Sequence, residues 1–212
     1  MEEKSALLDF WKHQLHISEK VLDAFRKVER RDFVPEEERE NAYDDRPLPI
    51  LRGKTISQPT TVMFMTSLLD VKEGQKILEL GTGSGYQSAI LAYLVGDKGK
   101  VISTEVVPEL VQFSRENLQK AGMKNVTVLE EDGSRGVKSQ SLFDRIIITA
   151  ACREIPPLLI SQLKAGGIVV APVGNQHEQQ MVKGVKKGKN LDITIFGSFV
   201  FSSLVGKYGF EI

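Results

Sequence analysis

The chain has 212 residues, a length that suits one domain with a core large enough to need no disulfide or metal. Lysine plus arginine and aspartate plus glutamate both number 28, and this zero net charge argues against a nucleic-acid partner, which would select a basic surface. Cys152 is the only cysteine, which excludes an internal disulfide and fits a reducing compartment. Residues 1–10 are too charged for a secretion signal, and no apolar run is long enough to span a membrane. We expect a soluble, cytoplasmic monomer with no membrane or nucleic-acid partner.

Residues 1–70 predict helices and turns. Ser18 can cap a helix with one apolar face. The residues of that face are Val21, Leu22, Phe25 and Val28. The prolines within residues 46–50 favour an extended segment, and Pro59 suits the first turn of a second helix. We therefore expect an N-terminal helical extension ahead of the main fold.

From Lys76 onward, short apolar runs alternate with segments of helical spacing. The expected strands are residues 77–80, 101–104, 126–129, 146–149 and 168–172. The expected helices are residues 86–95, residues 107–121, and one that Pro156 opens and that Gly166 and Gly167 end. This alternation implies right-handed crossovers around a buried parallel sheet, and two strands within residues 180–201 predict an antiparallel edge. The expected fold class is α/β, a doubly wound Rossmann-like domain with its core at 71–175 and C-terminal strands at 176–212.

A glycine-rich loop follows the first of these strands. Its sequence is Glu79-Leu-Gly81-Thr82-Gly83-Ser-Gly85. A dinucleotide-binding loop would read G-x-G-x-x-G, but Tyr86 occupies the place of the last glycine, which disfavours a nicotinamide oxidoreductase. The E-x-G-x-G-x-G form resembles the first motif of the class I methyltransferases, where the loop passes beside the amino-acid part of S-adenosylmethionine. The alternative is a tight turn that binds nothing.

Two acidic residues end the next two strands. Glu105 can accept hydrogen bonds from both hydroxyls of a ribose. Asp132 can accept one from an adenine amino group, while the backbone of Gly133 faces the ring. Because the carboxyl ends of parallel strands share one edge of a sheet, the acids and the glycine loop predict a nucleoside site there.

Two segments ahead of the glycine loop carry a more specific signal. They read Arg46-Pro-Leu-Pro-Ile50 and Thr55-Ile56-Ser57-Gln58-Pro59. With the glycine loop they resemble the protein-L-isoaspartate O-methyltransferase family, and the resemblance covers roughly residues 25–175. Further matching segments are Phe33-Val-Pro35, Ala42-Tyr-Asp44, Phe143-Asp144, Thr149-Ala-Ala151, Ile155-Pro156 and Pro172-Val-Gly174.

The resemblance implies transfer of a methyl group from S-adenosyl-L-methionine to the free carboxylate of L-isoaspartyl residues in damaged proteins. Ser57 would be the active-site serine. The substrate would contact Ser57, Gln58 and Pro59. The cofactor would contact Thr55, Ile56, Glu79, Gly81, Thr82, Gly83, Gly85, Glu105, Asp132 and Gly133. The chain departs from the family at Glu131, where glycine is usual, and at Ser202-Ser203, where Val-Pro is usual, so no C-terminal contact is expected.

This chemistry needs no strong base, because a carboxylate is already ionised at neutral pH, with a pKa of about 4. Ser57 would position that carboxylate and would not attack, since no nucleophile elbow surrounds it and no histidine is paired with it in the sequence. An alternative role for Ser57 is to cap the helix that begins at Pro59. A methyltransferase acting on tRNA or a small molecule, and a non-catalytic nucleoside-binding module, are the competing functions.

Several other residues are interpreted as structural. Cys152 is expected to be an unactivated thiol, and His13 and His16 lack the further ligands that a metal site needs. Trp11 and Phe10 are expected to anchor the first helix. A lysine cluster is expected to be a solvated hairpin turn; its members are Lys183, Lys186, Lys187 and Lys189.

Overall fold

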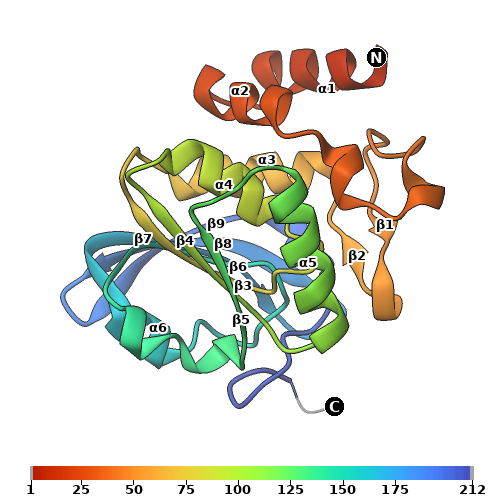
Figure 1. The fold of residues 1–212 in the computed structure, drawn as a ribbon. Helices are drawn as coiled ribbons and strands as arrows, with labels where there is room; N and C mark the ends of the chain where they lie inside the picture. The colour runs from red at the N-terminus through yellow and green to blue at the C-terminus, as the bar shows by residue number, and fades with distance from the viewer. Residues whose placement is uncertain (1, 211–212) are drawn as a thin grey trace.

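A seven-stranded sheet lies at the centre of the computed structural model, which describes residues 2–210 (Figure 1). Its strands stand in the order β5-β4-β3-β6-β7-β8-β9. Their bounds are β3 Lys76–Leu80, β4 Lys100–Glu105, β5 Val126–Glu130, β6 Phe143–Ile148, β7 Leu163–Gly174, β8 Gln179–Lys187 and β9 Asn190–Phe199. Strands β3 to β7 pair in parallel, whereas β8 and β9 are antiparallel. The predicted doubly wound sheet with an antiparallel edge is confirmed.

Helices cover both faces of this sheet (Figure 1). Helices α3 (Pro59–Leu69), α4 (Tyr86–Val95) and α5 (Pro108–Lys120) lie on one face. Helix α6 (Pro157–Gln162) and the short turns η4 (Gly133–Arg135) and η5 (Lys138–Gln140) lie on the other. The predictions for α3, α4 and α5 are confirmed within a residue or so at each end.

The predicted end of α6 is wrong. The helix ends at Gln162, because Leu163 already pairs with Phe143 of β6 and is buried in the core. Gly166 and Gly167 therefore lie inside β7 and do not stop the helix. Here the sheet contact outweighs the local signal for a helix end.

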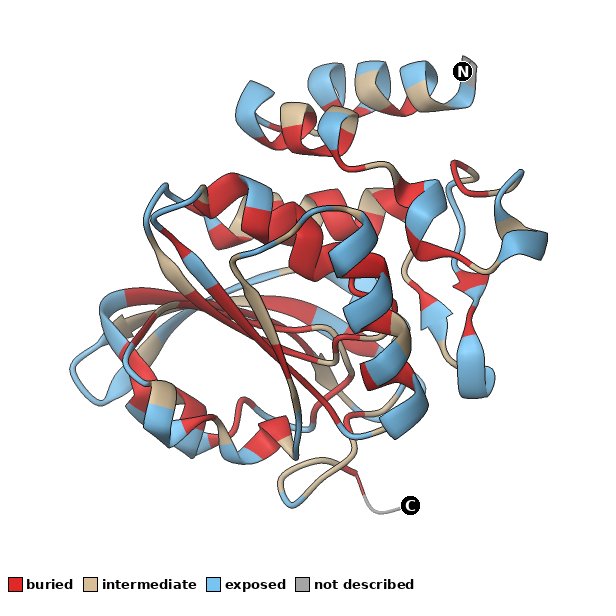
Figure 2. Cartoon of the chain, viewed as in Figure 1, coloured by how far each residue is buried: buried red, intermediate tan, exposed pale blue. Residues whose placement is uncertain are grey.

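Each central strand is buried on both faces, which explains its unbroken apolar sequence (Figure 2). Side chains alternate between two cores along each strand. Ile77 and Ile147 pack into the core that includes α3, α4 and α5. Leu78 and Ile146 pack into the core on the α6 side.

The N-terminal extension packs over α3 and α4 (Figure 1). Its elements are α1 Glu2–His13, α2 Glu19–Lys27, η1 Arg30–Phe33, η2 Glu36–Glu38, β1 Leu48–Pro49, η3 Leu51–Gly53 and β2 Thr55–Ile56. Trp11 anchors this extension, because its indole is fully buried and meets the Phe25 ring edge-on, with the ring centroids 4.6 Å apart. Phe10 is 45% exposed and does not share this role. Ser18 does precede α2, but its side chain makes no capping hydrogen bond. None of the helices described has the length and apolar content of a transmembrane segment.

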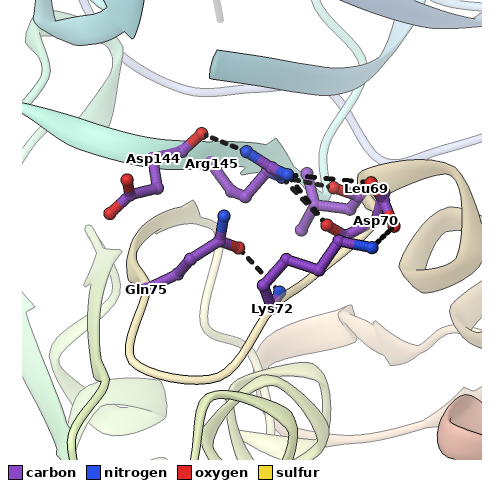
Figure 3. A network of polar contacts seen from close by, with 6 residues as sticks. All are labelled: Leu69, Asp70, Lys72, Gln75, Asp144 and Arg145. Carbon is purple, nitrogen blue, oxygen red and sulfur yellow. Dashed lines mark hydrogen bonds and ion pairs between the residues drawn. The ribbon is translucent and has the colours of Figure 1, made fainter. Parts of the chain in front are cut away.

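The far end of α3 is fixed by a polar network on the amino side of the sheet (Figure 3). Arg145 of β6 donates from Nε to the carbonyl of Leu69 at 2.7 Å and from Nη2 to that of Asp70 at 2.9 Å. Asp70 ends the helix in a left-handed conformation, at φ 50°. Because helix C-termini leave carbonyls unsatisfied, a buried guanidinium placed here fixes where α3 ends against the sheet.

Candidate active site

A cavity of about 1380 Å³ opens at the carboxyl ends of the central strands. One part of its wall comes from β3, β4 and the residues that follow β3, β5 and β6, and includes Leu80, Gly81, Gly83, Thr104, Glu105, Gly133 and Thr149. Another part comes from β2 and the turn between β2 and α3, and includes Thr55, Ser57 and Gln58. One hollow therefore brings together residues that the sequence separately predicts for a cofactor and for a substrate.

The glycine loop is tied to its neighbouring strands. The amide of Gly81 donates to the carbonyl of Thr104 at 2.9 Å, and the hydroxyl of Thr149 donates to the carbonyl of Gly81 at 2.7 Å. A Cβ on Gly81 would lie 2.7 Å from Thr149 Oγ1, and its φ of +92° also favours glycine. Gly133 is as constrained, since a Cβ there would lie 2.1 Å from Thr104 Oγ1. Glycine at both positions therefore allows the loops to pack closely against the strand-end threonines Thr149 and Thr104 at the cavity wall.

Glu105 lies at the cavity, where its predicted role places it. Its carboxylate lines the cavity and is held by backbone amides: Oε2 accepts from Gly83 at 3.0 Å, and Oε1 accepts from Val106 at 2.9 Å and Val107 at 3.1 Å. The residue is 8% exposed, so the carboxylate is fixed in place before any ligand arrives. A carboxylate has about four acceptor positions, so Oε2 retains capacity for a hydroxyl donor.

Glu79 and Thr82 lie behind the loop and do not line the cavity. The Glu79 carboxyl is fully buried, accepts from the Ser88 hydroxyl of α4, and has its pKa raised to about 7 by that burial. The Thr82 hydroxyl lies 2.6 Å from that of Ser103. In this arrangement both residues support the loop, and their predicted contacts with the cofactor stay predictions. Gly85, at the start of α4, lies outside the cavity wall as well.

Asp132 is turned toward the C-terminal segment. Its Oδ1 accepts from the amide and hydroxyl of Ser134, and its Oδ2 accepts from the Lys207 amide at 2.9 Å and from Arg135 Nε at 3.3 Å. Partial burial alone would raise the pKa of Asp132, but the hydrogen bonds from Lys207 and Ser134 bring it below its usual value. With about four acceptor positions already used, little capacity remains for an adenine amino group. Glu131, which the sequence reasoning did not select, lines the cavity instead.

Ser57 lies in the turn between β2 and α3 and lines the cavity together with Thr55 and Gln58. Its hydroxyl makes no hydrogen bond with any residue in 2–210, and Gln58 is the residue that precedes α3. The helix-cap interpretation of Ser57 is therefore wrong, and the hydroxyl is available to a ligand. Ile56 and Pro59 are buried and lie outside the cavity wall, so they shape the turn from behind.

The sequence reasoning missed the C-terminal wall of the cavity. Residues 198–205 line it, together with His177 and Glu178 from the turn between β7 and β8. This segment is held by backbone hydrogen bonds of 2.8 Å, from the Ala151 amide to the carbonyl of Ser202 and from the Leu204 amide to the carbonyl of Ala151. The ring of Phe199 also stacks on that of Phe64 of α3, with the ring centroids 6.0 Å apart. The aromatic residues of the segment were the available signal.

The remaining candidates have structural surroundings. Cys152 is buried, and this burial raises the pKa of its thiol to about 12, which confirms an unactivated thiol. Lys187 and Lys189 flank the exposed hairpin turn between β8 and β9, whereas Lys186 donates to the carbonyl of Leu163. Within residues 2–210 no three His, Cys, Asp or Glu side chains gather as a metal site would require.

Comparison with known proteins agrees with this geometry. The sequence model of the protein-L-isoaspartate(D-aspartate) O-methyltransferase family matches residues 2–209. The chain belongs to this family. The match includes the C-terminal wall that the sequence resemblance left out.

Relatives of similar length extend the comparison. A protein-L-isoaspartate O-methyltransferase of Methanococcoides burtonii is 46% identical over 194 residues, covering 91% of this chain and 95% of the relative. One from Pyrococcus horikoshii is 42% identical and covers 100% of this chain and 99% of the relative. A solved putative protein-L-isoaspartate O-methyltransferase from Plasmodium falciparum, in complex with S-adenosyl-L-homocysteine, superposes with a TM-score of 0.84 at 26% identity, covering 96% of this chain and 98% of that one. Another solved protein-L-isoaspartate O-methyltransferase gives a TM-score of 0.89 at 26% identity, covering 97% of this chain and 67% of that one.

The position of Glu105 leads to a direct test. Replacing Glu105 with alanine removes the predicted acceptor for the ribose, so S-adenosyl-L-homocysteine should bind about ten- to a hundredfold more weakly, as expected for loss of roughly 1.5–3 kcal/mol. Titration calorimetry on the folded variant measures this. Glu116→Ala on the exposed face of α5 is the matched control and should bind like the wild type. Unchanged affinity in Glu105→Ala would remove Glu105 from the cofactor site.

Proposed function

We propose that this chain transfers the methyl group of S-adenosyl-L-methionine to the free carboxylate of L-isoaspartyl residues in damaged proteins and peptides, which begins their repair through a methyl ester and a succinimide. The observation that carries the proposal is the single cavity that joins the glycine loop and Glu105 to the turn bearing Ser57. Family membership over residues 2–209 favours this substrate over tRNA or a small molecule.

The cavity fits the cofactor at its strand-end side. Glu105 would hold the ribose, and Gly81 and Gly133, which line the cavity, would lie beside the amino-acid and adenine parts. When bound, S-adenosyl-L-methionine supplies an electrophilic methyl group on a positively charged sulfur. This side of the cavity presents acidic side chains and backbone groups, which suit the positively charged, nucleoside-containing cofactor. Among the described residues it presents no cluster of metal ligands.

Ser57 would align the acceptor. The substrate carboxylate is ionised at neutral pH, with a pKa of about 4, so no residue has to remove a proton from it. A hydroxyl that has no partner among residues 2–210 can donate to one carboxylate oxygen and hold the other toward the methyl group. Holding two reactants in line can contribute up to roughly 7–11 kcal/mol to catalysis. A nucleophilic serine would need a neighbouring base, and the Ser57 hydroxyl has no hydrogen bond to one in the described chain.

We extend the proposal to the setting of the enzyme. The zero net charge favours a protein partner over a nucleic acid. The single, buried Cys152 is compatible with a reducing cytoplasm, and we propose that the chain acts there as a monomer.

Substrate choice is tested by methyl incorporation. An isoaspartyl peptide, its aspartyl twin and bulk tRNA are each incubated with the protein and radiolabelled S-adenosyl-L-methionine. The isoaspartyl peptide should be labelled and the other two should stay at background, because only that peptide presents the carboxylate next to the main chain. Equal labelling of the aspartyl twin, or labelling of tRNA alone, would contradict the proposed substrate.

The role of Ser57 is tested by Ser57→Ala. Loss of one well-placed donor in a preorganised site costs on the order of 3 kcal/mol, so turnover should fall about a hundredfold while S-adenosyl-L-homocysteine binds normally. Ser67→Ala, at the other end of α3, is the matched control and should keep wild-type turnover. Single-turnover kinetics with mass spectrometry of the quenched enzyme distinguish the mechanisms. A methyl group on Ser57 that then passes to the peptide, or unchanged turnover in the variant, would refute positioning.

A further inference from the structure

The first turn of α3 is held by a residue from outside the helix. Thr60 is the second residue of α3, and both its backbone amide and its hydroxyl donate to Asp45, at 2.9 Å to Oδ1 and 2.7 Å to Oδ2. The first amides of a helix have no partner within the helix, so a side-chain acceptor there stabilises its start. A carboxylate is favoured at this end because the helix dipole places partial positive charge there.

The N-terminal extension joins the same contact. Trp11 donates from Nε1 to the Thr60 hydroxyl at 2.7 Å, and its indole is fully buried against Phe25 of α2. The Thr60 hydroxyl therefore accepts from Trp11 while it donates to Asp45. Helix α1, the segment around Asp45 and the start of α3 are linked through this one side chain.

The segment that carries Asp45 also holds the other side of the Ser57 turn. Shortly after Asp45, strand β1 pairs with β2, with Leu48 opposite Ile56 and Pro49 opposite Thr55. The Ser57 turn thus runs between β2, which β1 fixes, and α3, whose start Asp45 fixes. Because the Ser57 hydroxyl has no partner among residues 2–210, its place in the cavity depends on these two attachments of the backbone.

We propose that Asp45 is a positioning residue for methyl transfer: it holds the start of α3 through Thr60 and so keeps the Ser57 hydroxyl aligned with the acceptor carboxylate. This inference rests on the proposed role of Ser57. Asp45 does not line the cavity, although its partner Thr60 does, so Asp45 acts through the start of α3 and touches neither substrate nor cofactor.

The experiment compares Asp45→Ala, Asp45→Asn and the control Asp44→Ala in the full chain. Asp44 is a neighbouring carboxylate that bonds only locally, to Arg46 Nε at 3.0 Å. Asparagine keeps one oxygen for the Thr60 amide, so Asp45→Asn should recover much of the function. Each protein is assayed for kcat and KM with an isoaspartyl peptide, for S-adenosyl-L-homocysteine affinity, and for amide hydrogen exchange across residues 55–66.

In Asp45→Ala, kcat/KM for the peptide should fall about tenfold, because looser alignment of Ser57 would remove part of the roughly hundredfold contribution expected of its hydroxyl. Affinity for S-adenosyl-L-homocysteine should stay within twofold, because Glu105 and Gly81 lie on other elements. Exchange of the Thr60 amide should become faster. Asp44→Ala should match the wild type in all three measurements.

A double-mutant cycle separates positioning from general destabilisation. If Asp45 acts through Ser57, Asp45→Ala should lower activity little further in a Ser57→Ala background, because the aligned hydroxyl is already absent. A tenfold loss that persists in that background would overturn the proposal, as would wild-type kinetics in Asp45→Ala. If Asp45→Ala does not fold, Asp45→Ser replaces it in the same cycle, because serine keeps a small polar side chain but lacks the two carboxylate oxygens that accept from the amide and the hydroxyl of Thr60.

The outcome is separable from that of the proposed function. Wild-type protein that labels no isoaspartyl peptide would refute the function. In that case amide hydrogen exchange at residues 55–66 alone tests whether Asp45 holds the start of α3. Faster exchange in Asp45→Ala would support this contact with Thr60, and unchanged exchange would refute it.

Discussion

The active site depends on the way β3, β4 and β6 end together at one edge of the sheet. Parallel pairing places Leu80 beside Thr104 and Ile148, so the loops that follow these three strands all begin at the same edge of the sheet. The strand order reverses here, because the chain continues from β3 to β4 on one side, whereas β6 lies on the other side of β3. Open parallel sheets bind their ligands in the crevice beside such a reversal of strand order. The hydrogen bonds from Gly81 to Thr104 and from Thr149 to Gly81 then fix the glycine loop against both neighbours.

The substrate side of the cavity has a different origin. Ser57 is carried by a short turn outside the sheet, and the turn is placed by α3 rather than by strand pairing within the main sheet. Arg145 anchors the far end of α3 to β6, and Asp45 holds its near end through Thr60. The N-terminal extension therefore contributes to the site by fixing a helix, and in the proposed mechanism the rigidity of that helix would align the acceptor.

Much of this arrangement could be predicted from local sequence. Strands such as β3 and helices such as α4 are specified by apolar spacing and by Gly85, whose effects act over a few residues. Glu105 could be placed because it ends a strand, and the ends of parallel strands converge whatever their loops do.

Features that depend on distant contacts could not be predicted in this way. Helix α6 ends at Gln162 because Leu163 joins β6, a contact that no local pattern contains. Asp132 is predicted to accept from adenine, but the Lys207 amide and Ser134 occupy its carboxylate, and Lys207 lies far along the chain. The C-terminal wall is held at the cavity by contacts between distant residues, among them Ala151 with the backbone of Ser202 and Phe199 with Phe64, so no local spacing in the sequence reveals it.

The central claim is that one cavity holds the cofactor at the strand ends and presents the acceptor carboxylate at Ser57. A crystal structure of the protein with S-adenosyl-L-homocysteine and an isoaspartyl peptide tests it most directly. We predict a ribose hydroxyl within hydrogen-bond distance of Glu105 Oε2, and a peptide carboxylate oxygen within hydrogen-bond distance of the Ser57 hydroxyl with the cofactor sulfur on its far side. A ribose bound away from Glu105, or a peptide carboxylate held by other residues with Ser57 unengaged, would contradict the account.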